Sequence, residues 1–234
     1  MRVYEIPEGS RTSKGRAIQN LINIEQDDKV KAFICTKDLK DEDYINQHYV
    51  IMATKKGQVK KTSLEKYSRP RINGINAITI REGDELLVAK LTNGESQIVM
   101  ALKSGKAIRF EEAKTRPMGR SASGVRGIRL QHDKDEVIGM VSINDMESNI
   151  LVVSANGYGK RSKLEDYRIT NRGGKGVKTI SITDKTGDLV SIKNVNDSNG
   201  LMIINKSGIA IRMAVKDLRV MGRATQGVKL INIK

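Results

Sequence analysis

Glycine and basic residues recur together along the chain, in a combination suited to chemistry with anions. In the first kind of site, a glycine turn is followed four residues later by Lys or Arg. The four turn glycines lie 48, 52 and 51 residues apart and are Gly57, Gly105, Gly157 and Gly208. Because the pair returns at a nearly constant interval, the sequence predicts a repeated structural unit.

A second kind of site follows the first by 17 to 19 residues and places an Arg shortly before a glycine. It occurs five times, at residues 11–15, 71–74, 120–124, 172–176 and 223–227. The fourth copy reads Arg-Gly-Gly-Lys-Gly, in which the glycines permit positive φ and leave peptide N–H groups uncovered. Arg172 adds a planar donor fork and Lys175 a mobile charge. These groups suit contacts to a phosphate backbone and do not recognise individual nucleobases.

Catalytic and metal-binding patterns are missing from the sequence. Neither His48 nor His132 has the spacing of a catalytic or metal site, and Cys35 alone forms neither a disulfide framework nor a zinc site. The segment 172–176 lacks the Gly-Lys-Ser/Thr and the following helix of a P-loop. We therefore predict no catalytic residue, no metal and no cofactor in this chain. We interpret His48 as a strand-edge residue and Cys35 as a small core residue.

Short strands are predicted between the glycine sites. After the second site, apolar and polar residues alternate, as in 125–130, and this period of two is typical of a half-buried strand. Four short strands in a repeat of about 50 residues are typical of a propeller-like blade, and the predicted class is all-β. Only residues 63–67 and 162–167 indicate single helical turns. In one repeat the candidate strands are 97–103, 106–110, 124–130 and 136–143.

The repeats divide one predicted domain, residues 1–234, into five units. The first unit opens partway through the pattern, so we expect about five blades or part-blades. The acidic stretch 37–43 is interpreted as a surface loop that lengthens the first interval. The approximate units are 1–36, 44–95, 96–147, 148–197 and 198–234.

The overall charge favours a polyanionic partner. The chain has 42 Lys+Arg against 27 Asp+Glu, which gives a net charge of +15. Bases gather at the glycine sites and acids ten to thirteen residues after the second site, so we expect a basic belt with the acids apart from it. Aromatic residues, at 3%, are too few for a base-stacking channel. No apolar run approaches the roughly 20 residues of a membrane helix, and we expect a cytoplasmic protein without membrane contact.

Several repeated strings resemble the carboxyl-terminal domain of the A subunit of bacterial DNA gyrase, a type IIA topoisomerase, across essentially the whole chain. They are Tyr-Glu-Ile-Pro-Glu at 4–8, Ser-Arg-Thr-Ser-Lys-Gly at 10–15, Arg-Pro-Met-Gly-Arg at 116–120, Gly-Val-Arg-Gly at 124–127, Asn-Gly-Tyr-Gly-Lys-Arg at 156–161 and Met-Gly-Arg-Ala-Thr-Gln-Gly-Val-Lys-Leu at 221–230. The resemblance implies a β-pinwheel, a propeller-like ring of four-stranded blades whose basic perimeter bends and wraps duplex DNA. It also implies a non-catalytic role in negative supercoiling, with the B subunit and the rest of the A subunit of gyrase as partners in an A2B2 assembly. ATP and Mg²⁺ are expected elsewhere in that holoenzyme, and the location is the bacterial cytoplasm at the nucleoid.

One hallmark of that family is absent. Its Gln-Arg-Arg-Gly-Gly-Lys/Arg-Gly box belongs to the first blade, and residues 172–176 resemble it in a later blade with Thr170-Asn171 in place of Gln-Arg. We therefore expect incomplete wrapping by this chain. The alternatives are the corresponding domain of topoisomerase IV, a propeller used as a protein-interaction scaffold, and an enzyme carried on a propeller ring.

The candidate DNA-binding residues are the bases and glycines of the two repeated sites. They are Arg11, Lys14, Arg16, Lys60, Lys61, Arg69, Arg71, Arg109, Arg120, Arg126, Lys160, Arg161, Arg172, Gly173, Gly174, Lys175, Lys178, Arg212, Arg223 and Lys229.

Overall fold

Antiparallel hairpins form the basic unit of the structure, a computed structural model that describes residues 3–22, 24–25, 28–71 and 73–233. The turn glycine of each hairpin has a positive φ of 78° to 86°, a conformation that side chains with a Cβ rarely adopt. The turn glycines of the sequence therefore mark hairpin turns, as predicted. The hairpins are β1 (Tyr49–Thr54) with β2 (Gln58–Ser63), β4 (Gln97–Leu102) with β5 (Lys106–Glu111), β8 (Asn149–Ser154) with β9 (Tyr158–Lys163), and β12 (Gly200–Ile204) with β13 (Ala210–Ala214).

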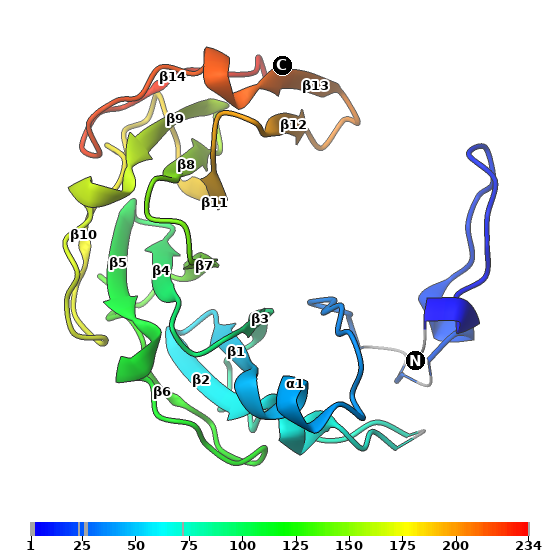
Figure 1. Cartoon of the computed structure of the whole chain (residues 1–234). Helices are drawn as coiled ribbons and strands as arrows, with labels where there is room; N and C mark the ends of the chain where they lie inside the picture. Colours follow the sequence, from blue (N-terminus) through cyan, green and yellow to red (C-terminus); the bar gives the residue numbers. More distant parts are fainter. Residues whose placement is uncertain (1–2, 23, 26–27, 72, 234) are drawn as a thin grey trace.

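Three of the hairpins are extended on both sides into four-stranded sheets. The inner strands, which line the concave side of the arc in Figure 1, are β3 (Leu86–Thr92), β7 (Val137–Ile143) and β11 (Leu189–Val195). The outer strands are β6 (Val125–Arg126), β10 (Val177–Lys178) and β14 (Val228–Lys229). The sheet orders are β3-β1-β2-β6, β7-β4-β5-β10 and β11-β8-β9-β14, while β12 and β13 form a two-stranded sheet.

The outer strand of each sheet comes from the following repeat. β6 follows the β4–β5 hairpin in sequence but pairs with β2, and β10 and β14 in the same way pair with β5 and β9. The prediction that the four strands of one repeat lie together in one blade is wrong in this respect. Alternation identifies a strand, but the partner of that strand depends on tertiary packing.

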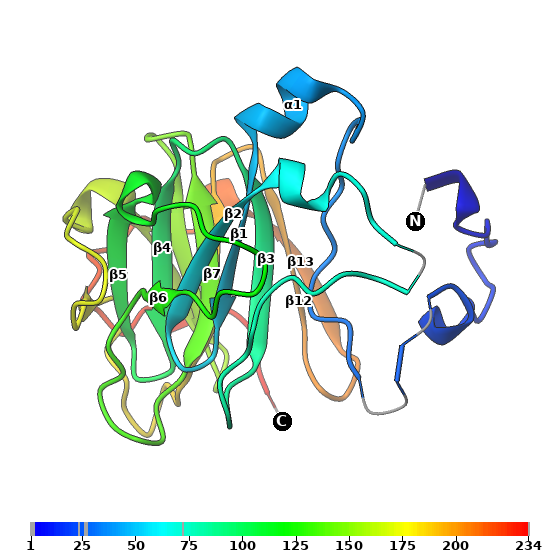
Figure 2. The same ribbon diagram turned by 90° about the horizontal axis from the view of Figure 1, so that it is seen from below.

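The hydrophobic core lies between neighbouring sheets. Alternate residues of β4 face opposite sides: Ile98 and Met100 pack in the cluster shared with β1 and β2, and Val99 and Ala101 pack in the cluster shared with β8 and β11. Since both faces of the middle sheet are covered, its hairpin is apolar on both faces. Figures 1 and 2 show the sheets side by side along the arc, and this packing fixes the outer strands on the convex side.

Short helical turns follow the hairpins. The segments predicted as single helical turns contain 3-10 helices, η3 (Leu64–Tyr67) and η5 (Leu164–Asp166), and η4 (Glu112–Lys114) and η6 (Val215–Asp217) take the same place in other repeats. Before the first hairpin lie η1 (Val3–Glu5), η2 (Ile18–Asn20) and α1 (Glu42–Gln47).

The sequence did not predict α1. Asp41 caps this helix by accepting a hydrogen bond from the Tyr44 amide, and Ile45 is its buried residue. The acidic stretch 37–43 thus ends in a helix start and is not only a loop. His48 lies between α1 and β1, where its Nδ1 is 2.7 Å from the Tyr44 carbonyl oxygen.

Two further expectations are wrong. Cys35 is exposed, on a segment (residues 29–36) that forms neither a helix nor a strand. The acids do not all stand apart from the glycine sites: Asp135 is buried and accepts hydrogen bonds from the amide and hydroxyl of Ser104, beside the β4–β5 turn. Asp84 accepts from the amide of Lys56 beside the β1–β2 turn. These carboxylates support the hairpin turns.

Candidate nucleic-acid interface

Three equivalent segments run along the convex side of the arc, and we call them the first strap (residues 117–124), the middle strap (169–176) and the third strap (220–227). Each contains an Arg-to-Gly site and leads into an outer strand. One hydrogen bond holds the start of each strap to the hairpin of the preceding repeat, from the amides of Met118, Thr170 and Met221 to the carbonyls of Lys61, Arg109 and Arg161.

Neighbouring outer segments are also tied to one another. The amide of Arg129, just after β6, donates to the carbonyl of Gly174 in the middle strap at 2.9 Å. In the next interval, the amide of Ser181 donates to the carbonyl of Thr225 at 3.1 Å. The straps therefore form a continuous peripheral band.

Exposed basic residues lie at equivalent places on this band. Arg126, Lys178 and Lys229 each occupy the second position of an outer strand and are exposed, as is Lys175 in the middle strap. Arg172 and Arg223 are half-buried, and their guanidinium groups donate to the carbonyls of Arg126 and Lys178. The structure thus brings Arg126, Arg172 and Lys175 together on one stretch of the band, and Lys178 and Arg223 together on the next.

Five of the predicted DNA-binding residues are buried instead. Lys60, Lys61, Arg109, Lys160 and Arg161 lie on hairpin strands and are 0%, 4%, 8%, 1% and 6% exposed. As phosphate contacts these five are wrong, because their charged groups point at other protein atoms and a phosphate has no access to them. Their place in the middle of a strand between two packed sheets explains the burial.

The buried bases join repeats. The Lys60 ammonium donates to the carbonyls of Ala77 (2.6 Å) and Arg120 (2.5 Å), and the Lys160 ammonium donates to the Gly222 carbonyl (2.5 Å) and the Thr225 hydroxyl (3.1 Å). Each lysine therefore ties a hairpin to the strap that crosses it.

In each of the first three hairpins, the basic residue that follows this lysine position contacts the 3-10 turn of the next repeat. Arg109 donates to the carbonyls of Leu164 (2.7 Å) and Tyr167 (3.0 Å). Arg161 donates to the Leu218 carbonyl (2.5 Å) and pairs with Asp197. Lys61 lies 3.8 Å from the Glu112 carboxylate. Arg212, the fourth equivalent, is exposed on β13.

Burial changes the acidity of the lysines. It lowers the pKa of Lys60 to about 8, and the nearby Arg120 guanidinium adds to the decrease. Burial likewise lowers the pKa of Lys160 to about 8, with the Asp166 carboxylate acting in the opposite direction and Arg223 adding to the decrease. The charged forms of these groups are therefore less favourable in the folded chain than in water.

The remaining predicted residues lie elsewhere. Arg11, Lys14 and Arg16 are exposed on the amino-terminal segment, which is apart from the arc in both ribbon views, and Arg69 and Arg71 are exposed on the segment after η3. The half-buried Arg120 belongs to the first strap. Of the two glycines, Gly173 has a φ of +82°, and Gly174 is exposed and does not share that conformation.

Sequence reasoning missed one set of bases. Arg116, Arg168 and Arg219 are exposed, and each lies four residues before the strap arginine of its repeat. Their signal was present, since they recur at intervals of 52 and 51 residues, but they precede the glycine sites used to define the pattern.

Within the described part of the chain, no group of three His, Cys, Asp or Glu side chains is arranged to hold a metal ion. No described helix is long and apolar enough to cross a membrane.

Packed sheets that exchange their outer strands around an arc define a propeller-like all-β domain of the β-pinwheel class. A profile of the family described as "DNA gyrase C-terminal domain, beta-propeller" matches residues 1–37, 48–93, 98–144, 148–196 and 201–234. The chain belongs to this family.

Individual relatives agree with the family. The chain is 44% identical over 234 residues to the A subunit of DNA gyrase from Staphylococcus aureus strains NCTC 8325 and Mu50, a match that covers all of this chain and 26% of each relative. It thus spans about a quarter of the length of these curated relatives.

Solved structures share the fold. The C-terminal domain of a DNA topoisomerase IV matches with a TM-score of 0.87 at 23% identity, covering 98% of this chain and 70% of that one. A DNA gyrase A C-terminal domain matches with a TM-score of 0.84 at 22% identity, covering 100% and 74%.

Proposed function

We propose that this domain binds duplex DNA along its peripheral band and bends it around the convex side of the arc. The observation that carries the proposal is the recurrence of exposed bases at one structural position in three successive sheets, at Arg126, Lys178 and Lys229. Basic side chains at regular intervals on a curved surface suit the regularly spaced phosphates of a duplex. Contacts to phosphate position the duplex without selecting its sequence.

Membership of the family supports further roles, which we include in the proposal. The domain acts without catalytic chemistry of its own, within a gyrase in which two A and two B subunits form an A2B2 assembly in the bacterial cytoplasm. It presents a bent DNA segment for strand passage, so that the enzyme introduces negative supercoils. ATP and Mg²⁺ act in other parts of that assembly, and this domain needs no cofactor.

Salt dependence tests the binding mode. Each phosphate contact contributes about −0.9 to the slope of log K against log salt concentration, so the three outer-strand bases alone give about −2.7. We expect the chain to bind duplexes of unrelated sequence with equal affinity and with at least this slope, measured by fluorescence anisotropy. A slope near −1, or affinity confined to one sequence, contradicts the proposal.

Bending is tested separately. Smooth bending of a 20 to 30 base-pair site by 40° to 90° costs on the order of 1 to 6 kcal/mol, which contacts spread along the curve must offset. A doubly labelled duplex should therefore shorten end to end when the chain binds. Ligation of nicked circles in its presence should change the linking number in one direction. Binding without either change would leave a DNA-binding domain that does not wrap.

The fold is also that of a topoisomerase IV C-terminal domain, so the alternative proposal is that the whole enzyme is a topoisomerase IV. An assembly of the complete A and B subunits distinguishes the two, because gyrase activity converts relaxed circles to negatively supercoiled ones with ATP. Relaxation without supercoiling favours the topoisomerase IV alternative.

A further inference from the structure

The middle strap differs from its two neighbours in what lies beneath it. Lys60 and Lys160 stand three residues after their turn glycines and fill the space under the first and third straps with an ammonium group. The equivalent residue under the middle strap is Ile108, which donates no hydrogen bond from its side chain. Beside Ile108 is a cavity of about 190 Å³.

The same strap positions that contact an ammonium in the third repeat line this cavity. Gly222 and Thr225 contact Lys160, and their equivalents in the middle strap are Asn171 and Gly174. A Cβ added at Gly174 would lie 3.5 Å from Ile108 Cδ1, an ordinary contact distance. The cavity is therefore lined by the strap positions equivalent to those that contact a lysine ammonium in the third repeat.

Backbone hydrogen bonding differs in the same place. The Ala122 amide donates to the Gly119 carbonyl (3.1 Å) in the first strap, and the Thr225 amide donates to the Gly222 carbonyl (3.2 Å) in the third. The equivalent amide of Gly174 makes no such bond, and neither it nor the amide of Lys175 has a hydrogen-bond partner among the described residues. Successive backbone N–H groups in a turn conformation can line a concavity that binds an anion, and these two amides are available for that role.

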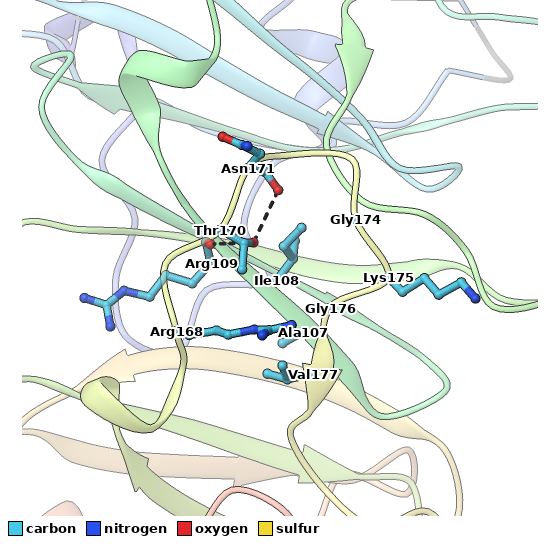
Figure 3. Close-up of a pocket in the computed structure, with 10 residues that line it drawn as sticks. All are labelled: Ala107, Ile108, Arg109, Arg168, Thr170, Asn171, Gly174, Lys175, Gly176 and Val177. Atoms are coloured by element: carbon cyan, nitrogen blue, oxygen red, sulfur yellow. Dashed lines mark hydrogen bonds between the residues drawn. The ribbon is translucent and has the colours of Figure 1, made fainter.

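The charge around the cavity also favours an anion. Among the described residues that line it none is acidic, and Arg168 and Lys175 belong to the lining. Figure 3 shows the side chain of Arg168 extending toward Ala107 and Val177, whereas Lys175 points away from the other labelled residues. A guanidinium provides paired donors for the oxygens of a phosphate.

We propose that the cavity under the middle strap binds a phosphate group, held by the amides of Gly174 and Lys175 and by the guanidinium of Arg168. In the DNA complex this group is a backbone phosphate, and that part of the inference rests on the proposed function. The middle strap is then a fixed phosphate contact of the band, and the first and third straps are closed by their own lysines.

NMR of the 234-residue chain tests the site with inorganic phosphate, titrated at constant ionic strength against sodium chloride. We expect the amide signals of Gly174 and Lys175 to shift, and those of Ala122 and Thr225 to remain in place. Arg168→Gln should weaken the phosphate response about tenfold, because it removes a charged hydrogen-bond donor to the phosphate. Arg219→Gln is the matched control, because Arg219 is also exposed, at the equivalent place beside the third strap.

A second titration uses a short mixed-sequence duplex. Shifts at Gly174 and Lys175 with both phosphate and duplex support the full inference. No shift of these amides with phosphate, or equal weakening by Arg168→Gln and Arg219→Gln, overturns it.

The two remaining outcomes separate the cavity from the proposed function. A duplex that binds without moving these amides overturns the assignment to DNA and leaves the proposed function intact. A phosphate response without duplex binding supports the cavity and contradicts the proposed function.

Discussion

Arg109 on a hairpin strand and Arg126 on an outer strand carry the same guanidinium group in the same repeat, and their surroundings are opposite. Arg109 is 8% exposed and bonded to two carbonyls of the next repeat, whereas the side chain of Arg126 is exposed on the convex side. A base that recurs in every repeat can thus serve either cohesion or ligand contact. Its position between sheets or outside them decides which.

The largest expected effect is on stability, from removal of a buried base. Arg109→Met leaves the Leu164 and Tyr167 carbonyls without their charged donor and should lower the free energy of unfolding by about 3 kcal/mol. Arg212→Met removes the exposed equivalent on β13 and should change it by less than about 0.5 kcal/mol. Urea unfolding measures both. Equal losses would abolish the distinction between cohesive and exposed bases.

The next effect is on DNA binding, from removal of exposed bases. Changing Arg126, Lys178 and Lys229 together to Gln should reduce the magnitude of the salt slope by about 2.7 and weaken binding alike for all sequences. Unfolding should change little. A control variant replaces three exposed lysines outside the band, namely Lys66, Lys134 and Lys163. If the control lowers the slope as much, net charge rather than the band accounts for binding.

The smallest effect, taken over one pH unit, is a pH dependence of stability that belongs to buried Lys160. Its folded pKa of about 8 lies below the ordinary 10.5, so between these values the unfolded chain holds a proton that the folded chain has released. Stability relative to Lys160→Met should therefore rise with pH above 8, by at most about 1.4 kcal/mol per pH unit, and should be constant below pH 8. Denaturation on both sides of pH 8 measures the difference, with the exposed Lys229→Met as control.

Local features of this fold were readable from the sequence. The positive φ of Gly105 was predictable because glycine adopts the positive φ of a tight hairpin turn without a steric cost, and a Cβ there would also lie 2.6 Å from Ile182 Cγ1. The apolar runs of β4 and β8 likewise identify buried strands. Such features depend on neighbours in the chain, which the sequence shows directly.

Features that depend on distant residues were not readable. The burial of Lys60 requires carbonyls from residues 77 and 120 to converge on its ammonium, 17 and 60 positions away. Residue type alone favours an exposed lysine. The pairing of Val125 with Val59 is similarly invisible to periodicity, because a two-residue strand fits any free edge.

The exchange of outer strands has a consequence for the order in which the chain folds during synthesis. The sheet of β1, β2 and β3 receives its fourth strand only when Val125 and Arg126 have left the ribosome, after the whole of the next hairpin, β4 and β5, has been made. Each of these sheets therefore has an unpaired edge strand until the outer strand of the following repeat has been made. A pause in translation between repeats prolongs the exposure of that edge to other chains. Completion of the arc passes from one repeat to the next in the direction of translation.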